Sequence, residues 1–296
     1  MSEKPTEKSS KRVSAAVKST APGKLTGRHS GGYTPFGYIN VQGFLGLGDE
    51  FIAAIIGGLL EGCNIEDRDL VLQRTIDADR CHDALNERQV SGVVLHAYPD
   101  HPIVNVLAAS GIPIVAICDA ISEFPSVVVD DAAGARTLAH YLSDRGYKRV
   151  LYRRRRHEIE TGKRRFEGFM EVAVLRDLNV TITMVEDDFI LYPEEIAYLN
   201  DTQNHPCAVT GWRDLSMMAV AKFCRESGLR VPDDVALAGF DGMSMVPQVS
   251  GVLTTIVAPW SELAKTSVSV LSSLLQKKQV PRETIIPVRL RIGDTT

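Results

Sequence analysis

Short apolar runs alternate with segments of helical periodicity along most of the chain. Runs rich in β-branched residues predict strands at 38–41, 92–96, 112–118, 126–129, 148–152, 181–185, 207–210 and 235–240. Apolar positions spaced three and four residues apart predict helices at 50–62, 131–145, 164–176 and 214–227. Strands that alternate with helices and carry few hairpin signals form parallel sheets, and continuous apolar runs are covered on both faces.

The amount of this pattern predicts more than one sheet. Predicted strands and helices span most of the 296 residues, which is a long chain for a single open sheet. We therefore expect an α/β protein with two doubly wound parallel-sheet lobes and a ligand cleft between them. In such sheets the crevice lies beyond the carboxyl ends of the strands. Asp241 directly follows the strand at 235–240, between Gly239 and Gly242. It either faces this crevice or caps the next segment.

The N-terminal 36 residues have a different composition. Seven Lys and Arg against two Glu give the first 30 residues a charge of +5, which leaves −9 for the remainder. Before Leu25 there is no Leu, Ile, Phe or Tyr, so this segment has too little apolar surface to offset its ordering entropy. We expect a disordered basic tail at 1–36, and no basic character in the folded part that favours nucleic acid.

Several functional classes lack their sequence signals. No apolar run reaches bilayer length and the start has no apolar signal region, which predicts a cytoplasmic protein without membrane contact. The five cysteines have no CxxC spacing and the histidines form no ligand pair, so we expect buried reduced thiols and no metal. The loop Gly43–Gly48 does not match dinucleotide patterns, and there is no G-x-S-x-G elbow. We expect no cofactor and no enzymatic activity.

Five segments resemble the lactose-repressor (LacI/GalR) family, in the right order over about residues 37–292. They are VSGVVLHA, SGIPIVAICD, SVVVDDAAGARTLAHYLSDRGYKRVLY, RRFEGF and GLRVPDDVALAGFD with the following LTT. The resemblance implies a periplasmic-binding-protein type I-like effector domain. Its first lobe would comprise 37–130 plus 259–280, with helix 260–275 returning to it, and its second lobe 131–257 plus 283–296.

The resemblance implies a ligand-responsive transcriptional regulator that senses a small sugar, uronate or sugar phosphate by lobe closure, as a homodimer. A solute-binding protein for sugar uptake is the alternative. Family members normally begin with a helix-turn-helix, whose two packed helices need apolar residues at helical spacing. Residues 1–36 do not supply them, so we expect DNA binding only if a helix-turn-helix is supplied upstream or by a partner.

The family pattern also implies effector-binding residues. Asp241 matches its effector-binding acid, since a carboxylate accepts hydroxyl hydrogen bonds, and Arg165 matches its cleft arginine. Asp119 matches a second ligand-facing acid, and Phe189 falls where an aromatic ring often lies under the sugar. Apart from the family pattern, Trp212 either packs in the core or at the lobe interface, or contacts the ligand, because it precedes Arg213.

Two departures from the family pattern leave alternatives open. Arg213 occupies a position where the family commonly has Asn, and RRRRHE at 153–158 replaces a small loop. These arginines form a solvated loop, or they point into the cleft and bind an anion. A third alternative is that Arg165 and Arg213 pair with Asp119 or Asp241 and hold the cleft shut without a ligand.

Overall fold

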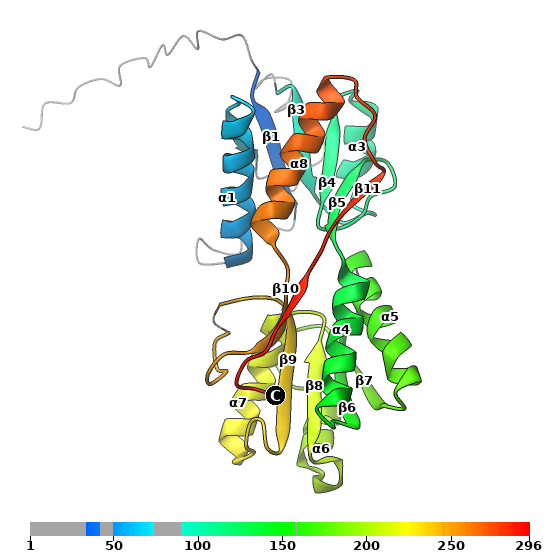
Figure 1. Ribbon diagram of the computed structural model, residues 1–296, viewed down its shortest axis with the longest axis vertical. Helices are drawn as coiled ribbons and strands as arrows, with labels where there is room; N and C mark the ends of the chain where they lie inside the picture. Colours follow the sequence, from blue (N-terminus) through cyan, green and yellow to red (C-terminus); the bar gives the residue numbers. More distant parts are fainter. Residues whose placement is uncertain (1–33, 42–49, 74–89, 158, 245) are drawn as a thin grey trace, which may run out of the picture. The chain divides into compact units, whose positions relative to one another are not determined.

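The computed structural model describes residues 34–41, 50–73, 90–157, 159–244 and 246–296, all within one compact unit, Tyr33–Thr296. The predictions for the basic tail, the helix-turn-helix, the loop Gly43–Gly48 and Cys81 lie outside these residues, except that the tail's last three positions, 34–36, are described. Phe36 is a buried residue of the first strand, so the predicted tail is one residue too long at this end. Two six-stranded sheets organise the described chain (Figure 1). The predicted fold class, two doubly wound parallel-sheet lobes, is confirmed.

The first sheet has the order β11-β5-β4-β3-β1-β2, and all its pairs are parallel. Every residue of β1, β3, β4 and β5 is buried, as their continuous apolar runs require. The strands are β1 (Phe36–Asn40), β2 (Leu70–Gln73), β3 (Gly92–His96), β4 (Ile114–Ile117), β5 (Ser126–Val129) and β11 (Glu283–Ile286).

The second sheet has the order β12-β10-β9-β8-β6-β7. Its pairs are parallel except at the edge, where β12 runs antiparallel to β10. The strands are β6 (Arg149–Arg155), β7 (Asn179–Val185), β8 (Cys207–Gly211), β9 (Val235–Asp241), β10 (Thr254–Val257) and β12 (Arg289–Arg291).

Helices pack on the sheets and define two lobes. On the first sheet, α8 packs on α1 and on β3 to β5, and the first lobe is this sheet with α1 (Glu50–Ile65), α3 (Ile103–Ala109) and α8 (Trp260–Leu275). On the second sheet, α4 packs on α5 and α7 packs on β8 and β9. The second lobe is this sheet with α4 (Asp131–Asp144), α5 (Glu160–Leu175), α6 (Pro193–Asn200), α7 (Met217–Ser227) and the 3-10 turns η1 (Thr202–Asn204) and η2 (Asp214–Ser216).

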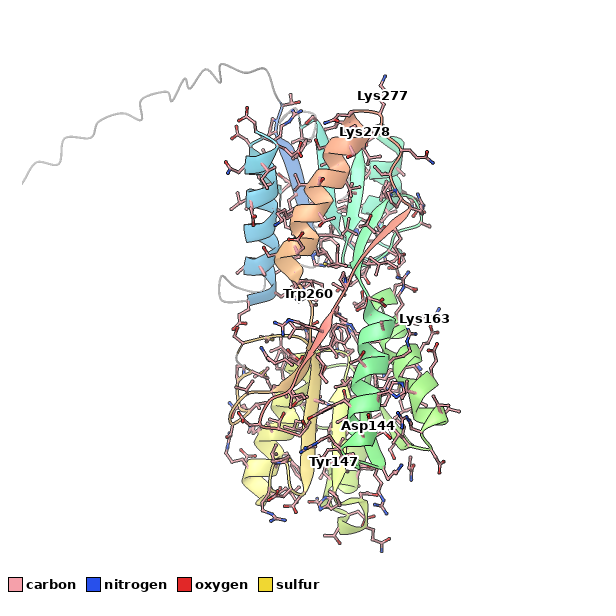
Figure 2. All side chains as sticks on the ribbon, in the orientation of Figure 1. Asp144, Tyr147, Lys163, Trp260, Lys277 and Lys278 are labelled. Carbon is pink, nitrogen blue, oxygen red and sulfur yellow. The ribbon has the colours of Figure 1, made fainter. Side chains whose placement is uncertain are left out.

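Three described connections pass between the lobes: β5 to α4, β10 to α8, and β11 to β12. Figure 2 shows Trp260 where the chain re-enters the first lobe at the start of α8. The last connection corrects one predicted boundary. We assigned 283–296 to the second lobe, but β11 pairs with β5 of the first sheet and only β12 joins the second. The short apolar run at 283–286 carries no signal for which sheet it joins.

Most predicted elements lie within two residues of their observed bounds, and the larger differences lie at one end of an element. The strand expected at 148–152 continues through Arg155. The helix expected from 164 begins at Glu160, and the one expected from 214 begins at Met217 after η2. No helix in the described ranges is both long and apolar enough to span a membrane.

Candidate functional site

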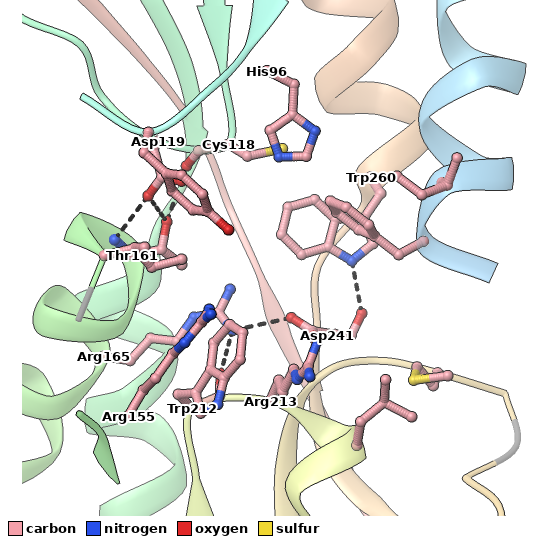
Figure 3. A pocket seen from close by; sticks show the side chains of 16 residues that line it. His96, Cys118, Asp119, Arg155, Thr161, Arg165, Trp212, Arg213, Asp241 and Trp260 are labelled. Carbon is pink, nitrogen blue, oxygen red and sulfur yellow. Dashed lines mark hydrogen bonds and ion pairs between the residues drawn. The ribbon is translucent and has the colours of Figure 1, made fainter. Parts of the chain in front are cut away.

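A pocket of about 270 Å³ lies where the carboxyl ends of both sheets meet (Figure 3). This is the place at which doubly wound sheets bind ligands. Both lobes line it. The first lobe contributes Phe51, Ile52, His96, Tyr98, Cys118, Asp119 and, at the start of α8, Trp260. The second lobe contributes Arg155, Ile159, Thr161, Arg165, Trp212, Arg213, Leu215, Asp241 and Met243. Five of the six predicted site residues therefore share one pocket.

The two glycines beside Asp241 have separate roles. A Cβ at Gly239 would meet Asp214 Oδ1 at 2.1 Å, so this residue lets the buried Asp214 carboxylate approach the strand. Asp241 has a φ of 121° and Gly242 a φ of 82°, a region that residues with a Cβ rarely adopt. The backbone therefore turns at the strand end and aims the Asp241 side chain at the pocket.

Arg165 is the most enclosed charge in the pocket. Its Nε donates to Asp131 Oδ1 at 2.7 Å, and its Nη1 donates to Asp241 Oδ1 at 3.0 Å. Its guanidinium lies 3.7 Å from the centroid of the Phe240 ring. Burial raises the pKa of Asp131 to about 7, while Arg165 opposes this shift. One guanidinium thus compensates two carboxylates.

Asp119 has a partner in the opposite lobe. Its Oδ1 accepts hydrogen bonds from the backbone N and the Oγ1 of Thr161, at 3.1 and 2.6 Å. Thr161 lies in the first turn of α5, whose residue Ile159 supplies no side-chain cap. The carboxylate therefore caps α5 from the first lobe, which its negative charge favours at a helix N-terminus. Burial raises the pKa of Asp119, and the hydrogen bonds from Thr161 oppose this.

Asp188 orients Trp212 and Arg213. Its carboxylate accepts from Trp212 Nε1 at 3.1 Å, from Arg213 Nε at 2.8 Å and from Ser216 Oγ at 2.5 Å. Asp188 is buried. Sequence reasoning missed it, although it lies three residues beyond the carboxyl end of β7, where the position rule for parallel sheets could have suggested it.

The arginine run is divided among several environments. Arg153 is completely buried against Glu195, at 2.7 Å, and against backbone carbonyls. Arg154 lies over the Phe166 ring, and the exposed Arg156 pairs with Glu186. Only Arg155 lines the pocket, with its guanidinium 5.1 Å from the Trp212 ring centroid. A single solvated loop is therefore the wrong description of this segment.

The remaining predictions divide as follows. Arg165 pairs with Asp241 and Arg213 pairs with Asp188. Both pairs lie within the second lobe, so neither holds the cleft shut in the way the third alternative expected. Phe189 does not line the pocket, and 54% of it is exposed. Its backbone N bonds the Asp187 side chain in an exposed turn, which directs the ring away. Among the described cysteines, Cys63, Cys118, Cys207 and Cys224 are buried and free.

Two further observations limit the chemistry of this site. In the part of the chain that the structure describes, no group of three His, Cys, Asp or Glu could hold a metal ion. Burial lowers the pKa of His96 to about 4, so this pocket residue is uncharged at neutral pH. The charged chemistry of the pocket therefore belongs to carboxylates and guanidinium groups.

Fold and pocket define a two-lobed α/β protein with a pocket of small-molecule size between its lobes. Residues 139–296 match the family described as periplasmic binding protein-like domain. The ribose operon repressor of Halalkalibacterium halodurans is 26% identical over 258 residues, which cover 83% of this chain and 73% of that protein. The repressor PurR of Photobacterium profundum is 26% identical over 244 residues, 78% and 73% of the two chains.

Solved structures show the same fold. A periplasmic binding protein/LacI transcriptional regulator from Alkaliphilus metalliredigens, complexed with D-xylulofuranose, has a TM-score of 0.72 at 20% identity and covers 89% of this chain and 99% of that one. A complex of the regulator CelR with cellobiose has a TM-score of 0.75 at 19% identity, over 89% and 84% of the chains. The chain belongs to the periplasmic binding protein-like domain family, as the effector-binding domain of a lactose-repressor-type transcriptional regulator. This is a class of regulators, not of enzymes.

Proposed function

We propose that this domain senses a small sugar-like effector, which binds in the pocket between the lobes and shifts their closure. The observation that carries the proposal is the pocket itself, lined by charged and aromatic side chains from both lobes. A ligand that touches both lobes has a higher affinity for the closed arrangement than for the open one, and this difference drives the shift. The proposal assigns residues 37–130 and 259–286 to one lobe, and 131–257 and 289–296 to the other.

The size and polarity of the pocket support a molecule of monosaccharide size. Its volume of about 270 Å³ is just below the roughly 300–1,000 Å³ of sites for drug-sized ligands. Asp241 offers carboxylate oxygens to ligand hydroxyls, and such charge-assisted bonds are stronger than neutral ones. We propose Asp241, Arg213 and Trp212 as effector-binding residues, and Arg165 as the residue that positions the Asp241 carboxylate for the effector. Asp119, which is bonded to Thr161, instead joins the lobes.

Relatives support the effector class. One structural neighbour was solved with D-xylulofuranose and another with cellobiose. The proposed effectors of this chain are sugars, uronates and sugar phosphates. We further propose that the protein acts in the cytoplasm as a homodimer, as the resemblance to the lactose-repressor family implies.

Isothermal titration with a panel of pentoses, hexoses, uronates and sugar phosphates tests the proposal. We expect at least one compound to bind with one site per chain and to reduce the radius of gyration in X-ray scattering. Asp241→Asn removes the carboxylate charge and should weaken that binding by about tenfold or more, since hydrogen bonds to charged groups contribute roughly 1.5–3 kcal/mol.

Asp233→Asn is the matched control, because this exposed acid precedes the same strand but lies outside the pocket. It should bind as the unaltered protein does. A correctly folded protein that binds no member of the panel would contradict the proposed function.

A further inference from the structure

We propose that the pocket selects an effector with an acidic group, a carboxylate or a phosphate, and that Arg155 binds that group. This inference rests on the proposed function and specifies its ligand. It starts from the three arginines that line one small pocket, Arg155, Arg165 and Arg213. These arginines differ in whether the protein places a carboxylate beside the guanidinium group.

Two of the three guanidinium groups are already neutralised by the protein. Arg165 contacts the carboxylates of Asp131 and Asp241, at 2.7 and 3.0 Å. Arg213 Nη2 contacts Asp188 Oδ2 at 2.7 Å. Neither group needs a ligand to balance its charge.

Arg155 has no such partner in the part of the chain that the structure describes. Within the described residues, no carboxylate lies within ion-pairing distance of its side chain; its guanidinium is placed over the Trp212 ring. A cation in a partly enclosed pocket loses hydration, and a counter-ion recovers that loss. A ligand anion would supply this counter-ion.

The strand explains why Arg155 reaches the pocket. Side chains two residues apart on a strand point to the same face, and Arg155 is the last residue of β6. Arg153 points to that same face but is held by Glu195 and by the carbonyl of Asp188. Beyond Arg153 the pairing of β6 with β8 ends, while β6 continues beside β7 to Arg155, whose side chain lines the pocket.

The rest of the pocket favours one orientation of such a ligand. Asp241 and Asp119 lie at other positions of the wall, where their charges repel a second anion. Of the two, Asp241 accepts hydrogen bonds from the ligand hydroxyls. Trp212 is fixed by its bond to Asp188 and holds the guanidinium of Arg155 through a cation–π contact. An acidic sugar would therefore place its anion at Arg155 and its hydroxyls toward Asp241.

Matched ligand pairs test this inference in isothermal titrations. The pairs are D-glucose with D-glucuronate, D-galactose with D-galacturonate, and D-glucose with D-glucose 6-phosphate. We expect an acidic member to bind at least about tenfold more tightly than its neutral partner. Added salt should weaken the acidic ligand more than the neutral one, because it screens charges. Preference for the uronates or for the phosphate identifies which acid the site takes.

Arg155→Met retains much of the side-chain length and removes the charge. It should abolish the preference for the acidic member and leave the affinity for its neutral partner within about twofold, while Arg155→Lys should retain part of the preference. Arg156→Met is the matched control, because Arg156 is exposed and pairs with Glu186 outside the pocket. It should behave as the unaltered protein.

The outcomes separate the two proposals. Equal binding of neutral and acidic sugars, or an acid preference that survives Arg155→Met, would overturn this inference and leave the proposed function intact. Binding of no compound to the folded protein would overturn both.

Discussion

Arg165 and Arg155 line the same pocket, but the protein surrounds them differently. Arg165 is only 3% exposed and contacts two carboxylates and the carbonyl of Trp212. Arg155 lies at the end of a strand with an aromatic ring as its neighbour. The first guanidinium is part of a buried ion network that holds the second lobe together around Asp131 and Asp241, whereas the second is available to a ligand.

The difference shows that a charged side chain can line a binding pocket without binding the ligand. Its remaining hydrogen-bonding and charge capacity decides its role. Around Arg165, which we call the Arg165 end of the pocket, protein groups already satisfy most of the charge and hydrogen-bonding capacity. These bonds stabilise the structure, as does the contact from Asp119 to Thr161 between the lobes. At the Arg155 end, the capacity is left for the effector.

The largest expected effect is a difference in the free energy of unfolding between Arg165→Met and Arg155→Met. Arg165→Met removes the cation beside the buried Asp131 and the partly buried Asp241, and breaking a buried pair costs roughly 3–5 kcal/mol. Arg155→Met removes no ion pair in the described structure and should change the free energy of unfolding by no more than about 0.5 kcal/mol. Urea denaturation of both variants beside the unaltered protein measures this difference.

Arg165→Lys serves as the control for charge. It keeps a cation but loses the fork that reaches two carboxylates, so its stability should lie between those of Arg165→Met and the unaltered protein. Equal destabilisation by Arg165→Met and Arg155→Met would show that the protein does not depend more on the ion pairs of Arg165 than on Arg155.

A second, smaller effect concerns the contact between the lobes. Thr161→Val removes the hydroxyl that donates to Asp119 and retains the shape of the side chain. We expect a loss of about 1–3 kcal/mol, because the buried carboxylate loses a charge-assisted hydrogen bond. The unliganded protein should also become less compact in X-ray scattering, since this bond joins the lobes.

Thr137→Val is the matched control, because its hydroxyl bonds only the carbonyl of Ala133 in its own helix and is exposed. It should alter neither compactness nor stability by a comparable amount. If Thr161→Val destabilises the protein without changing the scattering of the unliganded form, the bond does not hold the lobes together.

The general architecture was accessible from sequence for a clear physical reason. Buried parallel strands need continuous apolar runs, and their carboxyl ends define the crevice. That reasoning predicted Asp241 at the crevice, and the family resemblance added Asp119; both line the pocket. It could not place β11, because a strand of four residues with mixed burial carries no signal for which sheet it joins.

Side-chain partners were not accessible in the same way. The acceptors of Arg153 are 35 to 63 residues away in sequence, so no local pattern distinguishes it from Arg155. Phe189 and Asp188 are neighbours in one turn, yet Asp188 is buried against Trp212 while Phe189 faces solvent. A one-residue error in register is enough to select the wrong member of this pair.

The smallest expected effect is a difference in pH dependence between the two ends. Burial raises the pKa of Asp131 to about 7 from its ordinary value of 3.8. Between these values the folded protein retains a proton that the unfolded chain releases, so this group's contribution to stability falls as the pH rises. Its slope cannot exceed about 1.4 kcal/mol per pH unit. Burial also raises the pKa of Asp214, to about 8, which adds a slope of the same sign.

Asp131→Asn isolates this contribution, because the amide cannot ionise but still offers an oxygen to Arg165. Urea midpoints at pH 5, 6 and 7 should fall less steeply with pH in Asp131→Asn than in the unaltered protein. Asp144→Asn, at an exposed carboxylate of the same helix, and Arg155→Met should both keep the original slope. A slope unchanged by Asp131→Asn would mean that Asp131 is ionised throughout this range and that Arg165 compensates it completely. In that case the carboxylates around Arg165 would stay ionised at all three pH values. The regions around Arg165 and Arg155 would then differ only in whether a carboxylate pairs with the arginine, and not in pH dependence.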